Sequence, residues 1–206
     1  MKFLLSLAIV AAGWSASGQG TSEAILGYSS STPVFANATA GWAFQTPNYL
    51  TVTELGCFTN VFAHNPLATA IEVGLWDGSG SLLASNSITP GSMLVNQTFY
   101  GSVTPVVTLD PGTTYYLGVF YAGGLSLDFA NVTAGDSVTS SSDIQVRGTA
   151  VSASGFVVPS YQTSTDGSIY AGANVRYQGG VPEPSPGLLV GLGGLLLAVR
   201  WRHRGS

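Results

Sequence analysis

No long stretch between residues 21 and 180 has apolar residues at every third or fourth position, which is the spacing that an amphipathic helix needs. The chain instead contains short runs of β-branched and aromatic residues, separated by Gly, Pro, Asp, Asn and Ser. This pattern is typical of strands joined by turns. A segment of this size accommodates about eight to ten strands of ordinary length, so we expect an all-β domain.

Five segments predict strands most clearly. They are 39–46, 48–58, 71–76, 81–88 and 105–121. The turn sequence 77–80, Asp-Gly-Ser-Gly, predicts a hairpin between the third and fourth segments. Asp110-Pro111-Gly112 predicts a turn within the last segment. In 48–58 the apolar phase changes near Glu54 and Gly56, which indicates a β-bulge there.

Weaker runs predict further strands. They are 125–130, 143–148, 155–159 and 173–178, whereas the Ser- and Thr-rich stretch 132–143 is expected to be a loop. Because two half-apolar sheets can bury each other, we predict a single antiparallel β-sandwich of jelly-roll type over residues 21–180. The content of Val, Leu, Ile, Phe, Tyr and Trp is too high for a disordered chain.

Residues 1–20 differ from the rest of the chain. Lys2 precedes an apolar run from Phe3 to Ala12, and small residues follow. That order is typical of a secretory signal peptide, with cleavage expected either in 15–20 or at 10–12, and the alternative is a buried N-terminal helix. We therefore predict that the chain is exported.

The charge of the predicted domain excludes one class of partner. Residues 21–180 contain nine acidic residues against Arg147 and Arg176, a formal balance of −7. Such a surface repels phosphate backbones, so we expect no binding to nucleic acid.

The residue types needed for catalysis are sparse. Cys57 is the only cysteine, so no disulfide forms within the chain, and its apolar surroundings indicate a small buried residue rather than a nucleophile served by His64. Asp128, Asp136 and Asp143 are spaced like no known metal-binding loop, and solvated loop acids are the favoured interpretation. We expect no enzyme activity, no catalytic or metal-ligating residue and no cofactor.

Aromatic side chains suggest a carbohydrate-binding module as the alternative function. Trp76 shares its strand face with Glu72 and Gly74, which makes it the best candidate for an outward side chain that contacts a glycan. Strands also favour aromatic residues for packing alone. The other aromatic candidates are Trp42, Tyr115, Tyr116, Tyr121, Tyr161 and Tyr170.

Residues 181–206 have three parts in a fixed order. Prolines at 182, 184 and 186 predict an extended linker. The apolar run 187–199 is 13 residues long, about 20 Å as a helix against a hydrocarbon core of about 30 Å. The basic cluster of Arg200, Arg202 and Arg204 holds that end in the cytoplasm. We predict a short single membrane helix.

These residues resemble a PEP-CTERM sorting signal. The likeness covers 181–204 and consists of Pro182-Glu183-Pro184, the Leu- and Gly-rich segment and the arginine cluster. It implies that a membrane-embedded exosortase recognises the Pro-Glu-Pro region and removes the tail. A permanent single-span anchor is the alternative. The stretches 41–58, 73–85 and 109–124 also resemble, loosely, the β-sandwich ectodomains that carry such tails.

The combined prediction is a protein exported by a Gram-negative-type bacterium. It would be anchored transiently in the inner membrane and then released to the cell surface or extracellular matrix. There we expect a structural or adhesive role in the exopolysaccharide or biofilm matrix. The alternative is a module that recognises extracellular glycans.

Overall fold

A computed structural model of the chain describes most of the predicted domain. The described residues are 20–27, 32–35, 37–58, 70–120, 127–129, 139–152, 155–162, 170 and 172–179. Their regular secondary structure is β-strand throughout, and the strand pairings are antiparallel. The prediction of an all-β domain is confirmed. The described part contains no helix of the length and apolarity needed to cross a bilayer.

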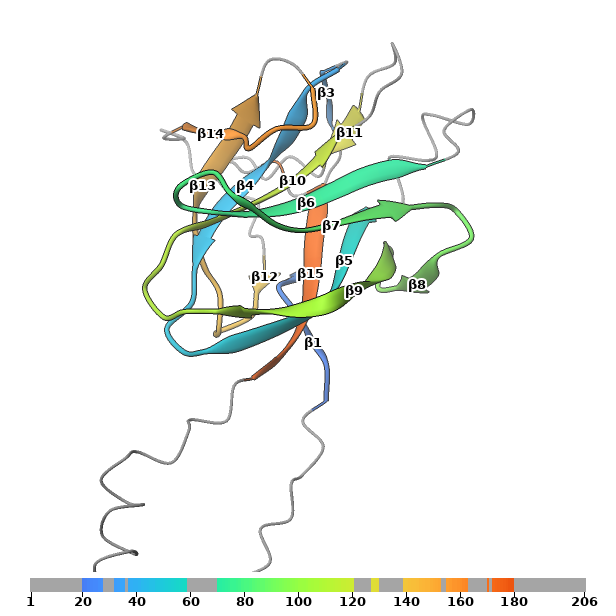
Figure 1. The fold of residues 1–206 in the computed structure, drawn as a ribbon. Coiled ribbons are helices and arrows are strands. Elements are labelled where there is room, and N and C mark those ends of the chain that lie inside the picture. Colours follow the sequence, from blue (N-terminus) through green and yellow to red (C-terminus); the bar gives the residue numbers. More distant parts are fainter. Residues whose placement is uncertain are drawn as a thin grey trace, which may run out of the picture.

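The strands form two large sheets (Figure 1). The first has, in order, β1 (Ser22–Glu23), β15 (Ala173–Gly179), β5 (Leu50–Phe58), β9 (Thr98–Leu109) and β8 (Met93–Val95). The second has β14 (Ser160–Gln162), β13 (Gln145–Ser152), β4 (Thr39–Gln45), β10 (Tyr115–Phe120), β6 (Ile71–Asp77) and β7 (Leu82–Ile88). Two small pairs accompany them: β3 (Thr32–Phe35) with β11 (Leu127–Phe129), and β2 (Ile25–Gly27) with β12 (Thr139–Ser140).

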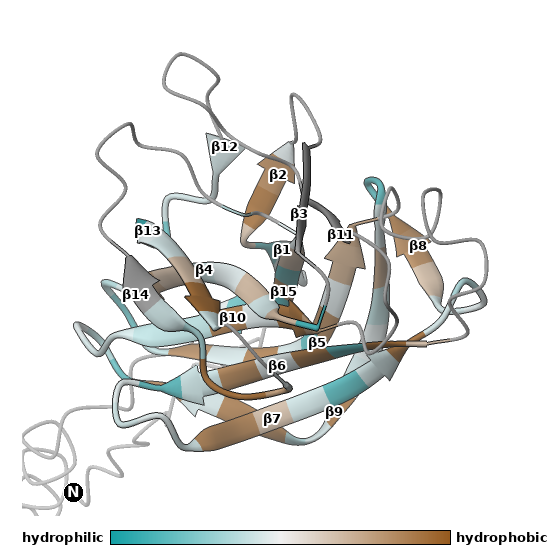
Figure 2. Cartoon of the chain, turned by 90° about the horizontal axis from the view of Figure 1, so that it is seen from above, coloured by the Kyte–Doolittle hydropathy of each residue, from teal (hydrophilic) through white to brown (hydrophobic). Residues whose placement is uncertain are grey.

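One hydrophobic cluster joins the two large sheets. Apolar and polar residues alternate along their strands (Figure 2), so each sheet has one face that can be buried. Side chains of both sheets contribute to the cluster. Its largest fully buried members include Trp42, Phe44, Leu75 and Leu117 of the six-stranded sheet and Leu50, Leu55, Leu109 and Tyr177 of the five-stranded sheet. We call the opposite side of each sheet its outer face.

The predicted turns and bulge are present. β6 and β7 form the expected hairpin, and Asp77 Oδ1 accepts hydrogen bonds from the backbone N–H groups of Ser79 and Ser81, both at 2.9 Å. Gly112, in the second turn, has a φ of 72°. Glycine adopts this backbone conformation readily because it has no Cβ atom, whereas other residues rarely do. The register of β5 against β9 shifts between Val52 and Glu54, where the apolar phase changes in the sequence.

Some strand predictions are wrong. Residues 155–159 are not a strand, because they cross the outer face of the six-stranded sheet. β8 and the first half of β9 were not predicted. They form a hairpin whose turn residues Asn96 and Gln97 both have positive φ values, 43° and 65°. β12 lies within the stretch 132–143 that was expected to be a loop.

Candidate functional site

Three glycines lie side by side on the outer face of the six-stranded sheet. Gly118 of β10 is the direct cross-strand partner of Gly41 on one side and of Gly74 on the other. A Cβ atom on Gly41 would lie 1.8 Å from the carbonyl oxygen of Leu117. A Cβ atom on Gly74 would lie 2.3 Å from the indole of Trp76. The three glycines therefore form a strip of sheet surface without side chains, which we call the floor. The Trp76 ring lies over the Gly74 end of this floor.

Residues 155–159, which we call the strap, cover this floor. Thr39 Oγ1 donates a hydrogen bond to the Gly155 carbonyl at 2.7 Å and accepts one from the Val157 N–H at 3.3 Å. The ring of Phe156 lies 5.2 Å from that of Trp76 and 6.2 Å from that of Phe120. Aromatic pairs at these distances pack favourably, so the strap and the sheet form one apolar layer.

Trp76 does lie on the outer face, as its alternation with Val73 and Leu75 of the core predicts. The expectation that its side chain is exposed for glycan contact is wrong, because only 3% of Trp76 is accessible. Gly74 lets the indole lie flat on the sheet, and Phe156 covers the ring from above. Neither contact is visible in the local sequence, because Phe156 lies 80 residues further along the chain.

Three of the other aromatic candidates, Trp42, Tyr115 and Tyr170, pack in or against the hydrophobic cluster. Trp42 is fully buried, and its Nε1 donates to the Ala173 carbonyl at 2.9 Å. Tyr115 is 3% exposed, Tyr116 is half-buried, and Tyr170 packs against the hydrophobic cluster. The side chains of Tyr121 and Tyr161 lie outside the described part. Tyr49, which sequence reasoning passed over, is 52% exposed in the connection between β4 and β5.

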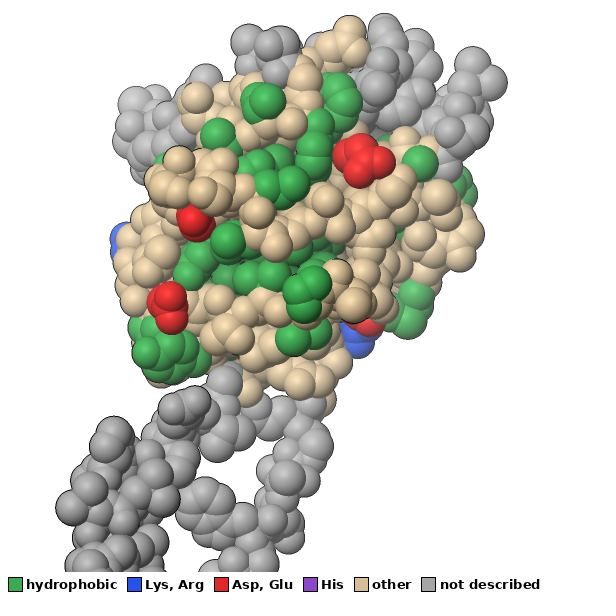
Figure 3. Space-filling model, in the orientation of Figure 1, with side chains coloured by type: hydrophobic (Ala, Val, Ile, Leu, Met, Phe, Trp, Pro, Cys, Tyr) green, Lys and Arg blue, Asp and Glu red, His purple; other side chains and the backbone are tan. Residues whose placement is uncertain are grey.

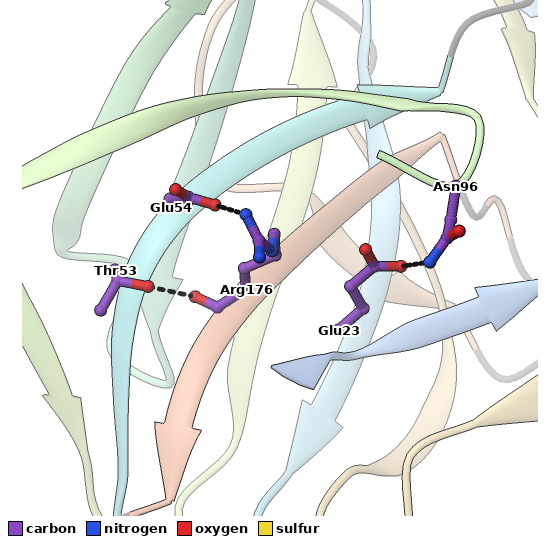
Figure 4. Close-up of polar contacts among 5 residues, drawn as sticks. All are labelled: Glu23, Thr53, Glu54, Asn96 and Arg176. Atoms are coloured by element: carbon purple, nitrogen blue, oxygen red, sulfur yellow. Dashed lines mark hydrogen bonds and ion pairs between the residues drawn. The ribbon is translucent and has the colours of Figure 1, made fainter. Parts of the chain in front are cut away.

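A charged cluster lies on the outer face of the five-stranded sheet (Figure 4). Nη1 of Arg176 is 2.6 Å from Oε2 of Glu54, and the guanidinium lies over the Tyr100 ring, 5.6 Å from its centroid. Glu23, opposite Arg176 on β1, accepts a hydrogen bond from Nδ2 of Asn96 at 3.1 Å. These contacts link β1, β15, β5, β9 and the β8–β9 turn, so we assign the cluster a stabilising role.

Cys57 behaves as the sequence predicts. Its side chain is fully buried in the hydrophobic cluster, and this burial raises the pKa of the thiol far above its ordinary value of 9.0. A thiol of that kind is a poor nucleophile at neutral pH, because the thiolate is the reactive form. His64, the base that a nucleophile would need, lies outside the described residues.

Of the three aspartates weighed as metal ligands, Asp128, Asp136 and Asp143, only Asp143 has a described side chain. Its Oδ2 lies 3.3 Å from the Tyr177 hydroxyl, which also donates to Ser141 Oγ at 2.5 Å. The described residues contain no group of three or more His, Cys, Asp or Glu that could hold a metal ion. The side chains of Asp128 and Asp136 are outside them.

The surface also has an apolar patch. In Figure 3 hydrophobic side chains gather in a central hollow, with acidic side chains around it. Exposed apolar residues on β7 and β9 include Leu82, Leu83 and Val106. Asn86 of β7 donates to the Ser102 carbonyl of β9 at 2.7 Å, so the two sheets meet at this side. Nothing in the structure identifies a partner for the patch.

A polar row crosses the outer face of the six-stranded sheet at the end that the strap leaves open. It consists of Gln145 and Arg147 of β13, Gln45 of β4 and Thr114, which precedes β10. Arg147 Nη2 donates to Oε1 of Gln45 and, at 3.4 Å, to Oε1 of Gln145. Gln45 Nε2 donates to Thr114 Oγ1 at 2.9 Å. Sequence reasoning used Arg147 only in the charge balance, because the residues of the row come from three separate segments of the chain.

The predicted sorting residues lie outside the described part of the chain. They are Pro182, Glu183, Pro184, Arg200, Arg202 and Arg204, together with the predicted signal peptide up to residue 19. The chain matches no protein-family model and no curated protein.

Proposed function

We propose that the chain is a protein exported by a Gram-negative-type bacterium and sorted by a PEP-CTERM tail to the cell surface or extracellular matrix, where its domain has a structural or adhesive role. The observation that carries this proposal is the order of the three parts in residues 181–204: Pro-Glu-Pro, a short apolar run and three arginines.

The physical properties of the three parts support sorting. The prolines hold 182–184 extended, which leaves the backbone accessible to a processing enzyme at the membrane face. The apolar run is shorter than a stable span requires, which suits an anchor that is needed only until processing. Arg200, Arg202 and Arg204 oppose passage through the bilayer, because moving guanidinium groups into hydrocarbon is costly.

The domain architecture supports a tethered module. We propose a jelly-roll-like β-sandwich, because the chain passes repeatedly between the two large sheets and the two sheets share one cluster. β1 pairs antiparallel with β15, with Ser22 opposite Tyr177. The chain therefore enters and leaves the domain at the same end (Figure 1). The rest of the domain extends away from the end at which the proposed tail is attached.

A structural role fits the side chains of the domain better than catalysis. Cys57 is buried and protonated at neutral pH, and Arg176 is paired with Glu54. The domain also has to form without a disulfide, since the chain has a single cysteine.

Substitutions in the tail test the proposal. In a host with an exosortase, Glu183→Ala is expected to slow removal of the tail, so that full-length protein accumulates in the inner-membrane fraction. Replacing all three tail arginines by Gln is expected to let the segment pass through the membrane unprocessed. Asp110→Ala, an exposed acid in the domain, is the control and should be processed normally. Removal of the tail from the Glu183 and arginine variants at the wild-type rate would contradict recognition of these residues, whereas a tail that stays intact on wild-type protein would favour the permanent-anchor alternative.

A further inference from the structure

One turn of the domain lies next to the start of the predicted tail. Gly179, the last residue of β15, is paired with Leu50, the first residue of β5. β15 ends beside β1, at the end of the domain where the described chain starts and stops (Figure 1). The turn that joins β4 to β5, residues 46–49, therefore lies beside the point from which the tail leaves.

The 46–49 turn is fixed in place and carries an exposed aromatic side chain. Thr46, which begins it, and Leu50, which follows it, are each 1% exposed. The Thr46 carbonyl accepts a hydrogen bond from the Gly112 N–H at 2.9 Å, which ties this turn to the one that precedes β10. The three residues between Thr46 and Leu50 are exposed, and Tyr49 is 52% exposed. The fold therefore presents a tyrosine ring beside the start of the tail.

The tail is too short to hold this turn far from a bilayer. Seven residues, 180–186, separate β15 from the apolar run 187–199. A fully extended chain of seven residues spans about 25 Å at most, and lipid headgroups extend about 5–8 Å beyond the hydrocarbon core on each side. While the apolar run is in the bilayer, Gly179 therefore stays within about 20 Å of the headgroups.

We propose that the 46–49 turn contacts the lipid headgroups while the tail is anchored, with the Tyr49 ring at the membrane–water interface. Tyrosine favours this region because its ring is apolar and its hydroxyl is polar. A single exposed aromatic residue is ordinary on a protein surface, but here the short tether gives it a high effective concentration at the membrane, so a weak contact is enough to orient the domain. The proposal rests on the proposed function in one respect, namely the membrane segment, whether that anchor is transient or permanent.

A lipid surface fits the 46–49 turn better than the processing enzyme does. Pro182 lies three residues after Gly179, so the enzyme also approaches this end of the domain. Protein interfaces, however, depend on clusters of buried anchor residues, whereas this turn presents one large aromatic side chain. The formal balance of −7 in residues 21–180 opposes contact with an anionic bilayer, so we expect lipids without net charge to be the partner.

The test measures whether lipid headgroups reach the 46–49 turn. Full-length protein from a host without exosortase is inserted into phosphatidylcholine vesicles, and a fluorescent probe is attached through Asn48→Cys, so that Tyr49 is kept. Cys57 does not react with the probe, because its thiol is fully buried and burial raises its pKa. A nitroxide on the lipid headgroup should quench the probe. Tyr49→Ser should weaken this quenching at least about 2-fold, whereas Tyr49→Phe should keep part of it, because the apolar ring remains.

Position 157 is the matched control. Val157 is 46% exposed, and its N–H donates to Thr39 Oγ1, which lies about 20 Å along β4 from the 46–49 turn. A probe at Val157→Cys should therefore be quenched little. Inserting ten Gly and Ser residues after Gly180 should also weaken quenching at position 48, because a tether of about 17 rather than seven residues lowers the effective concentration about 4-fold.

Three results would overturn the proposal: equal quenching at positions 48 and 157, quenching that Tyr49→Ser leaves unchanged, or quenching at position 48 only after exosortase is added. Protein that does not insert into the vesicles would contradict the predicted membrane segment, and with it the proposed function as well. Inserted protein with an unquenched position 48 overturns this inference alone, so the two failures are distinguishable. Equal melting temperatures of wild type and the variants show that the fold is intact.

Discussion

The side chain of Asn174 takes the place of a strand partner on one side of Ile25, whose strand β2 pairs with β12 on the other side. The Ile25 N–H donates to Asn174 Oδ1 at 3.0 Å, and Asn174 Nδ2 donates to the Ile25 carbonyl at 2.9 Å. The same Oδ1 also accepts from the N–H of Val175 at 2.9 Å. The residues are fully or almost fully buried, so one carboxamide attaches β2 to β15 across 149 positions of sequence.

Asn174→Ala should therefore destabilise the domain strongly. The substitution leaves buried backbone groups of Ile25 without a partner, each at a cost of about 1–3 kcal/mol, and we expect a loss of about 3–5 kcal/mol in the free energy of unfolding. Chemical denaturation of recombinant residues 21–180 measures this change. Asn86→Ala removes a less buried bond, to the Ser102 carbonyl, and should cost only about 1 kcal/mol. Equal losses in the two variants would contradict the role of Asn174.

The glycine row predicts a steric effect. Gly41→Ala places a Cβ atom 1.8 Å from the Leu117 carbonyl oxygen, so β4 and β10 must move apart, and we expect destabilisation of about 3 kcal/mol or more. At Gly91 a Cβ atom would meet its nearest neighbour, Thr89 Oγ1, at 3.7 Å, which is an ordinary contact. Gly91→Ala should therefore unfold within about 0.5 kcal/mol of wild type. If both variants unfold like wild type, the close approach of β4 and β10 is incorrect.

The covering of Trp76 predicts a fluorescence result. Residues 21–180 contain two tryptophans, Trp42 and Trp76, and both are buried. Acrylamide should quench the folded wild-type domain weakly, and Phe156→Ala should increase quenching because the ring that covers Trp76 is removed. The double variant Trp76→Phe with Phe156→Ala assigns the increase to Trp76. Strong quenching of the wild-type domain would show that Trp76 is exposed and would revive it as a candidate for glycan contact.

The buried thiol predicts a loss of stability at alkaline pH. Burial raises the pKa of Cys57 in the folded state, so the unfolded chain loses this proton first as the pH rises past about 9. The protonated Cys57 thiol contributes fully to the free energy of unfolding below the pKa that this thiol has in the unfolded chain. Above that pKa the contribution is lost, and the free energy of unfolding falls by up to about 1.4 kcal/mol per pH unit. The pKa of Tyr177 is also raised, mainly by burial, and adds to the fall above about pH 10.

Cys57→Ala separates the two groups. Unfolding free energies of residues 21–180 between pH 8 and 11 should fall less steeply between pH 9 and 10 in this variant than in wild type, whatever its stability at neutral pH. Tyr177→Phe should keep the first part of the fall and reduce the part above about pH 10. Parallel curves for wild type and Cys57→Ala in the first interval would contradict the burial of the thiol.

Strands with a clear period of two were predictable from the sequence. β4, β5, β6, β7 and β15 begin and end within about two residues of their predicted bounds, because each alternates a buried and a less buried face or ends at a turn residue. β1, β2 and β12 are two or three residues long, too short to show a period. Their positions depend on contacts such as that of Ile25 with Asn174, which are distant in sequence.

The sites were less predictable than the strands. Alternation places Trp76 on the outer face, but its exposure depends on Phe156, and the strap that carries Phe156 has the composition of a strand. The polar row depends on the register of β13, β4 and β10, which the bulge at Arg147 alters. A composition rule cannot detect such a register shift, whereas the buried role of Cys57 follows directly from its apolar neighbours.

The measurement that tests the central claim most directly is the mass of the mature protein isolated from a host with an exosortase and from the same host without it. We predict that the protein from the first host lacks the arginine cluster, Arg200, Arg202 and Arg204, and ends near Pro182-Glu183-Pro184. In the host without the enzyme, residues 181–206 should remain and the protein should stay in the inner membrane. An intact tail on wild-type protein at the surface of the exosortase-containing host would contradict sorting and leave the permanent anchor as the account of residues 181–206.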